Sequence, residues 1–237
     1  MARTRRWIAP VAIYALFGLL GPVTERYLAE IVSSVGGLEV ILPEPTPAGG
    51  FTQYVSNVSQ LGVLAVVVIS ASSLAVDQPS EMGIFLRTRV RSAVDLVVPR
   101  VVVVFTVAMA AWIIGVLAAW YETTILLGGV SPAAVAAGTA YGAVYLVFVV
   151  ALLAALAALG RSTVATVLVG VVTLAALPII ALVPAVERWV PSELVGALDG
   201  MVAGAPLDGP LPAAGTALVA SAALLVLAVR RVGAREV

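Results

Sequence analysis

Six long apolar runs that contain no charged residue constrain this chain more than any other feature. They cover residues 8–24, 55–76, 101–120, 132–159, 163–183 and 213–229. Each run approaches the ~20 residues that an α-helix needs to cross ~30 Å of hydrocarbon. Hydrophobic residues form 62% of the sequence, charged residues only 11%, and the mean hydropathy is +1.12. So few charges could not cover a water-soluble domain, so the sequence predicts one all-α integral membrane domain with six transmembrane helices.

Missing residue types narrow the chemistry that the chain can perform. The sequence has no cysteine, no histidine and no lysine. Disulfides, thiolate nucleophiles and imidazole metal sites are therefore excluded, and so is a P-loop, which requires a lysine. The apolar runs also hold no paired carboxylates for acid–base hydrolysis. We therefore expect a protein that is not an enzyme, with no metal, no cofactor and no nucleic-acid partner.

The arginines predict the orientation in the membrane. If both termini are cytoplasmic, the inside segments hold eleven of the thirteen arginines, and only Arg26 and Arg188 lie outside. The outside segments then hold nine of the thirteen acidic residues. By the positive-inside rule, residues 25–54 and 184–212 are extracytoplasmic. The absence of lysine and the abundance of alanine, valine and arginine suggest a prokaryote of high genomic GC content, and hence its plasma membrane.

The N-terminal residues resemble a signal peptide but lack its cleavage site. Arg3, Arg5 and Arg6 precede the first apolar run, as a basic n-region precedes an h-region. No small-x-small motif follows Leu20, since the next residues are GPVTER at positions 21–26. We therefore expect an uncleaved first membrane helix that bends near Gly21 and Pro22.

Residues 77–100 form a polar segment between the second and third apolar runs. An amphipathic helix is indicated because apolar residues recur there at helical spacing, namely Leu86, Val90, Ala93, Val94 and Val97. Arg87, Arg91 and Asp95 follow the same spacing on another face. A basic amphipathic helix of this kind is typical of a surface where a soluble partner docks. The alternative is that these arginines only set the topology.

The uncharged spans argue against a proton-driven antiporter or an ion-selective pore. A charge at a span centre costs roughly 2.5–3.5 kcal/mol and persists mainly where an ion pathway uses it. Energy would then have to arrive from outside the bilayer. Some hydroxyls of the second and fifth spans are candidates to line a path, although such hydroxyls more often bond to their own helix. They are Ser70, Ser73, Thr166 and Thr173.

Two further patterns have competing interpretations. Gly138 and Gly142 form a GxxxG motif that is typical of helix packing, but chance is the expected source in a chain so rich in glycine and alanine. Residues 184–212 are either a plain loop or an outer hairpin that acts as a gate. Their apolar content favours the hairpin, with short interfacial helices at 187–189 and 192–195.

The order of these parts resembles the ABC-2 type permease family, the membrane subunits of certain ATP-driven exporters, over most of the chain. The residues that carry the resemblance are Thr46-Pro47 and residues 51–61 before the second span, Glu81-Met82-Gly83 followed by arginines and Arg100, and Pro191-Ser192-Glu193-Leu194 in the outer hairpin.

The resemblance implies a six-helix half-transporter that pairs with itself or with a similar permease. A separate cytoplasmic ABC ATPase, which binds the ATP and Mg, would dock on the segment between the second and third spans. The docking residues would be Glu81, Gly83, Arg87, Arg89 and Arg91. ATP binding would pull on this segment and on residues 3–7 to tilt the helices, exporting an amphipathic or lipid-like substrate. Two alternatives are an ATP-independent channel or carrier and a membrane anchor for a soluble enzyme.

Overall fold

A computed structural model of the chain describes residues 7–36, 44–74, 92–160 and 162–234. Within these ranges the chain forms helices joined by turns and loops, and no residue is in a β-strand. In chain order the helices are α1 (Ile8–Gly36), α2 (Pro47–Asn57), η2 (Val58–Gly62), α3 (Val63–Leu74), α5 (Ala93–Leu126), α6 (Pro132–Leu159), α7 (Thr163–Ala181), η3 (Glu187–Trp189), η4 (Pro191–Leu194), α8 (Ala197–Val202) and α9 (Leu211–Gly233).

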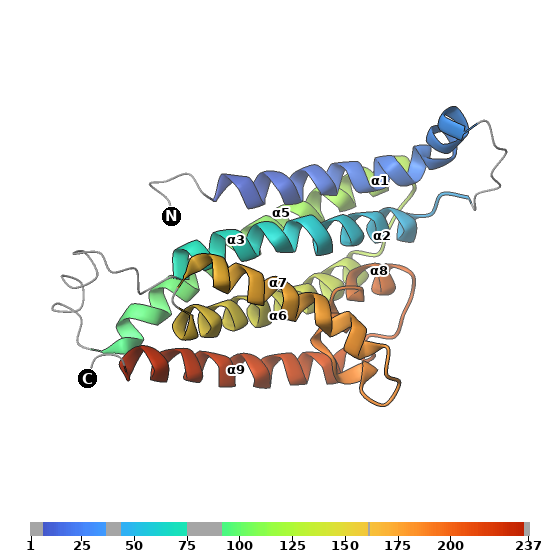
Figure 1. Cartoon of the computed structure of the whole chain (residues 1–237). Helices are drawn as coiled ribbons and strands as arrows, with labels where there is room; N and C mark the ends of the chain where they lie inside the picture. The colour runs from blue at the N-terminus through green and yellow to red at the C-terminus, as the bar shows by residue number, and fades with distance from the viewer. Residues whose placement is uncertain (1–6, 37–43, 75–91, 161, 235–237) are drawn as a thin grey trace.

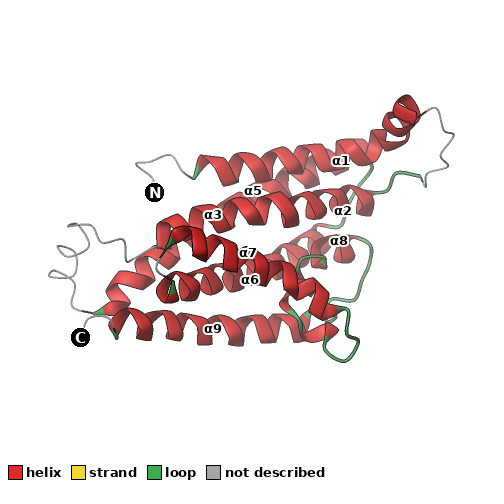
Figure 2. Ribbon diagram, viewed as in Figure 1, coloured by secondary structure: helices red, strands yellow, loops and turns green. Residues whose placement is uncertain are grey.

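Six helical segments in the described ranges are long and apolar enough to cross a membrane, which confirms the predicted number. One of them joins α2, η2 and α3 into a single segment, Pro47–Leu74. The chain is therefore a multi-pass membrane protein. All six segments alternate in direction along the bundle (Figures 1 and 2).

Several helices extend beyond the apolar runs that predicted them. α1 continues through Pro22 to Gly36, and Figure 1 shows its final turns leaving the line of the rest of the helix. α5 begins at Ala93, because Ser92 caps it by accepting a hydrogen bond from the Asp95 N–H. Because α1 extends to Gly36, the first part of the predicted outer segment 25–54 is helical. The end of a helix depends on where backbone hydrogen bonding and capping stop, whereas the end of an apolar run depends only on where polar side chains begin.

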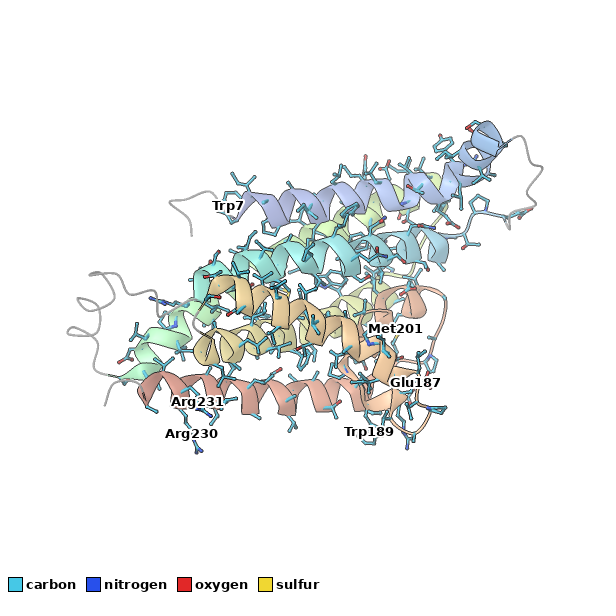
Figure 3. The ribbon with its side chains drawn as sticks, in the orientation of Figure 1. Trp7, Glu187, Trp189, Met201, Arg230 and Arg231 are labelled. Atoms are coloured by element: carbon cyan, nitrogen blue, oxygen red, sulfur yellow. The ribbon has the colours of Figure 1, made fainter. Side chains whose placement is uncertain are left out.

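The charged residues of the described ranges gather at opposite ends of the bundle. Arg230 and Arg231 lie at the end where α1 begins and α9 finishes (Figure 3). We call this end the arginine end. Glu187 lies at the other end, where α7 meets η3 (Figure 3), and we call it the acidic end. This arrangement agrees with the sorting of charge in the sequence, while the direction of insertion stays a prediction.

α6 is the central helix of the bundle, and its glycines are packing positions. A Cβ on Gly138 would lie 2.5 Å from the Leu198 Cα of α8, and a Cβ on Gly142 would lie 2.3 Å from the Trp112 ring of α5. Real Cβ atoms do not approach other atoms so closely, so both neighbours occupy space that only glycine leaves free. The expectation that this GxxxG arose by chance is wrong, because each glycine admits a close neighbour.

Trp112 lies in the core rather than near a membrane–water interface. It occupies the middle of α5, is 5% exposed, and its indole N–H donates a hydrogen bond of 3.1 Å to the Thr139 carbonyl of α6. The rings of Tyr14 and Tyr54 pack around it. The sequence predicts interface-like positions for the aromatic residues that close the third run, Trp112, Trp120 and Tyr121, but α5 continues to Leu126 and Trp112 lies near its midpoint.

Candidate functional site

The predicted docking residues cannot be placed in this fold. Glu81, Gly83, Arg87, Arg89 and Arg91 all lie outside the described residues. The C-terminal part of the same predicted segment is described, and it forms the first turns of α5. There Ala93 and Val97 are buried whereas Val94 is exposed. The docking role of residues 77–91 therefore remains a proposal.

The four predicted path-lining hydroxyls lie on α3 and α7, which pack against each other. Three of them donate hydrogen bonds to carbonyls one turn earlier in their own chain segment: Ser73 to Ile69, Thr166 to Ser162 and Thr173 to Val169. Ser70 is buried at 1% exposure. None of the four lines the large cavity of the bundle. These bonds are the local pattern that such hydroxyls usually adopt.

That cavity has a volume of about 650 Å³ and lies between α3, α6 and α7, next to η3 and η4. Its walls are mostly apolar and include Val63, Val67, Val171 and Leu174. α7 forms one side and is only lightly packed, since its buried residues are Thr166, Gly170 and Leu174 alone. A volume of this size fits a drug-sized molecule, so the cavity is the candidate functional site.

A π-helical turn brings two polar side chains of the second span to this cavity. In η2 the Val63 N–H donates to the Val58 carbonyl five residues earlier, in place of the α-helical partner four residues earlier. Ser59 and Gln60 of this turn line the cavity. π-turns of this kind are rare and recur at functional sites, because the extra residue redirects side chains on one face of the helix.

Carboxylates and hydroxyls line the part of the cavity that η3 and η4 contribute. Glu187, Ser192 and Glu193 are among the lining residues. Burial raises the pKa of the Glu193 carboxyl, and the nearby Glu187 charge raises that pKa further. Among the described residues, the Ser192 hydroxyl is buried without a hydrogen-bond partner. The cavity is thus amphipathic, with negative charge at the acidic end and apolar walls from α3 and α7.

Tyr145 of α6 supplies another polar group to the wall. Its side chain is 8% exposed and lines the cavity, and no hydrogen bond joins it to another described residue. It also borders a second space of about 20 Å³, which has room for about one water molecule. The Tyr14 side chain borders that space too, and its hydroxyl is buried without a partner within the described ranges.

Residues 187–210 cover the acidic end of the bundle, and we call them the cap. The segments 187–189 and 191–194 are short 3₁₀-helices, so the expected helical character is confirmed. Leu194, Leu198 and Met201 are almost fully buried, with exposures of 0%, 1% and 3%. A loosely attached loop would expose these side chains, so the cap is packed against the helices.

Side chains from three helices hold the cap in place. Thr52 of α2 lies 3.1 Å from Asp199, measured from its hydroxyl oxygen to Oδ2. The Tyr141 hydroxyl of α6 donates to the Leu207 carbonyl at 2.6 Å. The Thr216 hydroxyl of α9 is within bonding distance of the Trp189 carbonyl. These contacts join segments that are far apart in the sequence, so any movement of the cap would be coupled to α2, α6 and α9.

Sequence reasoning did not identify the residues that line the cavity. A weak signal existed for Ser59 and Gln60, since they are adjacent polar residues within a predicted membrane span. No local signal marks Tyr145, because its role depends on which helices face it. Among the described residues, no group of three or more histidine, cysteine, aspartate or glutamate side chains is arranged to hold a metal ion.

No family model matches this chain, and neither a curated protein nor a solved structure matches it. Its function therefore has to follow from its own residues and geometry.

Proposed function

We propose that this chain is the membrane-spanning permease subunit of an ATP-driven exporter of the ABC-2 type, in the plasma membrane of a prokaryote. The observation that carries the proposal is the amphipathic cavity of about 650 Å³ between α3, α6 and α7 of a bundle of six membrane-length helices. A cavity with apolar walls and a polar side suits a solute that is itself amphipathic. A protein that only anchored a partner would need no such space.

The energy source follows from the sorting of charge. Most arginines lie towards one end of the bundle and most acidic residues towards the other, with Arg26, Arg188 and Asp95 as exceptions among the described residues. Proton- or ion-coupled transport relies on ionisable groups along the path, which the apolar runs lack. A soluble ATPase bound at the arginine end would supply the energy instead. Residues 77–91, with Glu81 and three arginines, are the proposed docking segment.

The two termini would then be cytoplasmic, and the cap would lie on the outer face above the cavity. A transporter of this type needs two permeases, so a second copy of the chain or a related permease completes the unit. Binding of ATP would alternate access to the cavity from the two sides by tilting the helices around it.

Charge reversal at the docking segment tests the proposal. Arg87→Glu with Arg91→Glu, in the full-length chain purified from native membranes, should lower co-purification of the ATPase and its ATP turnover at least about tenfold. Arg26→Glu with Arg188→Glu is the matched control, because it makes the same change of charge at exposed positions of the acidic end, away from the proposed ATPase. Association and turnover that survive the first pair would contradict the docking role.

The rival functions give different results. A channel or carrier would move solute when the purified chain alone is placed in liposomes without ATP. An anchor for a soluble enzyme would keep its function when Ala175 on the cavity wall is replaced by tryptophan, provided that the chain still inserts. A permease subunit alone should move no solute without ATP, and it should lose transport when Ala175 is replaced by tryptophan.

A further inference from the structure

We propose that the cavity binds an amphiphilic organic cation, a molecule with an apolar body and one positively charged centre, an inference that rests on the proposed transport function. The structure gives three reasons, which are the charge of its lining, a largely buried tyrosine side chain without a hydrogen bond, and the shape of its apolar part.

The charge of the lining is negative. Glu187 and Glu193 both line the cavity, and no described residue that lines it is an arginine. The nearest arginine in sequence, Arg188, lies over the ring of Trp189, 5.7 Å from its centroid. Two carboxylates that line one cavity repel each other, and burial together with this repulsion raises the pKa of Glu193. A bound cation would relieve the repulsion, whereas a bound anion would increase it.

Tyr145 is an independent observation that points to a ligand. Its side chain is more than nine-tenths buried, faces the cavity, and forms no hydrogen bond within the described ranges. The Tyr145 hydroxyl stays open to the cavity, so a polar group or water there would be its hydrogen-bond partner. Its ring also offers a face to a positive charge, since aromatic faces attract cations.

The rest of the cavity selects an apolar body. Val67, Val171 and Leu174 form its walls, and Pro178 and Leu182 continue them towards η3. The carboxylates lie on the cap, so a bound cation would place its charge towards the acidic end and its apolar part between α3 and α7. A small inorganic cation would leave these walls uncovered.

Two ions of matched shape test the inference. Tetraphenylphosphonium and tetraphenylborate carry the same four phenyl groups around a central atom, with opposite charge. The purified full-length chain in detergent should bind the phosphonium saturably and at least about tenfold more tightly than the borate in equilibrium dialysis, after subtraction of protein-free micelles. Equal affinities, or tighter binding of the borate, would overturn the inference.

Variants locate the site. Glu187→Gln with Glu193→Gln should weaken phosphonium binding about tenfold. Glu30→Gln with Asp208→Asn removes the same charge from exposed positions of the acidic end that do not line the cavity, and it should leave the affinity unchanged. Ala175→Trp should weaken binding of both ions by filling the cavity. Unchanged affinity in the first pair, or equal loss in both pairs, would contradict binding at these carboxylates.

The result is separable from the proposed function. Binding is measured on this chain alone, so selective binding of the phosphonium without any associated ATPase would keep the inference and remove the permease assignment. If an associated ATPase is stimulated by the borate and not by the phosphonium, the permease assignment stands and the inference of a cation site is overturned.

Discussion

The ring of Tyr54 stacks on the indole of Trp112, with their centroids 5.8 Å apart and their planes at 21°. This contact joins α2 to α5, and the Trp112 N–H extends it to α6 through the Thr139 carbonyl. Gly142 of α6 lets the indole fit, since a Cβ there would lie 2.3 Å from it. Three helices are thus fixed to one another next to the small space that borders Tyr145.

Replacing Gly142 by alanine should destabilise the bundle. The added methyl would meet the Trp112 ring, which is held on its other sides, and overpacking of this kind costs about 1–3 kcal/mol. Gly215→Ala on α9 is the control, because a Cβ at Gly215 meets nothing within 4 Å. That change should be neutral or stabilise by about 0.4–1 kcal/mol. Thermal unfolding in detergent measures both, and equal effects would contradict the packing role of Gly142.

Single cysteines should reveal the orientation, because the natural sequence contains none. Glu30→Cys and Asp208→Cys, both exposed at the acidic end, should react with a membrane-impermeant maleimide in intact cells. Ala234→Cys, exposed just after α9, should react only after the membrane is permeabilised. The opposite pattern would place residues 77–91 outside the cell and leave a cytoplasmic ATPase nothing to bind.

Movement of the cap can be tested by linking it to α2. Thr52→Cys with Asp199→Cys replaces two side chains that lie 3.1 Å apart between oxygen atoms. A short, cleavable bifunctional thiol reagent should join them. If the cap opens during transport, the link should lower solute export by more than about tenfold, and reduction should restore it. Full export by the linked protein would show that the cap does not need to leave α2. Each single-cysteine variant controls for modification alone.

Stability should depend on pH through Glu193. Its pKa is raised in the folded state by burial and by Glu187, so the folded protein holds this proton more tightly than the unfolded chain does. The contribution of Glu193 is therefore fully favourable below the unfolded pKa and is lost as pH rises from there through the folded pKa. Unfolding midpoints in detergent should fall over that window, and Glu193→Gln should flatten the fall.

Glu187→Gln separates the two causes of this shift. It removes the neighbouring charge but leaves the burial of Glu193, so it should narrow the pH window without abolishing the dependence. A pH dependence that is identical in wild type and in both variants would show that Glu193 does not contribute.

Some features of the fold could be predicted because they are local. Residues 163–183 carry no charge and are bounded by Ser162 and Pro184, and α7 covers Thr163–Ala181 with Ser162 as its cap. The 3₁₀-helices at Glu187–Trp189 and Pro191–Leu194 also follow from short-range sequence. Helix ends such as Gly36 and Ala93 were harder to predict, because helical hydrogen bonding continues past the point where apolar side chains stop.

The candidate site was not predicted, because nothing local marks it. Ser70 and Thr173 were plausible from their hydroxyls, yet the cavity is lined instead by Ser59 and Gln60 of the second span. A helix of apolar residues has no sequence stripe that tells its inner face from its lipid face, since both are equally hydrophobic. The π-turn at Val58–Gly62 adds one residue to the helical turn, so it also shifts which side chains lie on the inner face.

The sequence by itself determined that this chain is a membrane protein, how many times it crosses, and how its charges divide between the two ends. Run length and charge are properties of short segments, and the cost of placing charge or unpaired backbone in hydrocarbon acts on each segment separately. Only the tertiary structure decided that Trp112 is a core residue, that Gly138 and Gly142 admit close neighbours, and that Tyr145 and Glu193 share one cavity. Those relationships depend on which helix faces meet, and inside a bilayer close packing of shapes, rather than apolar character, selects them.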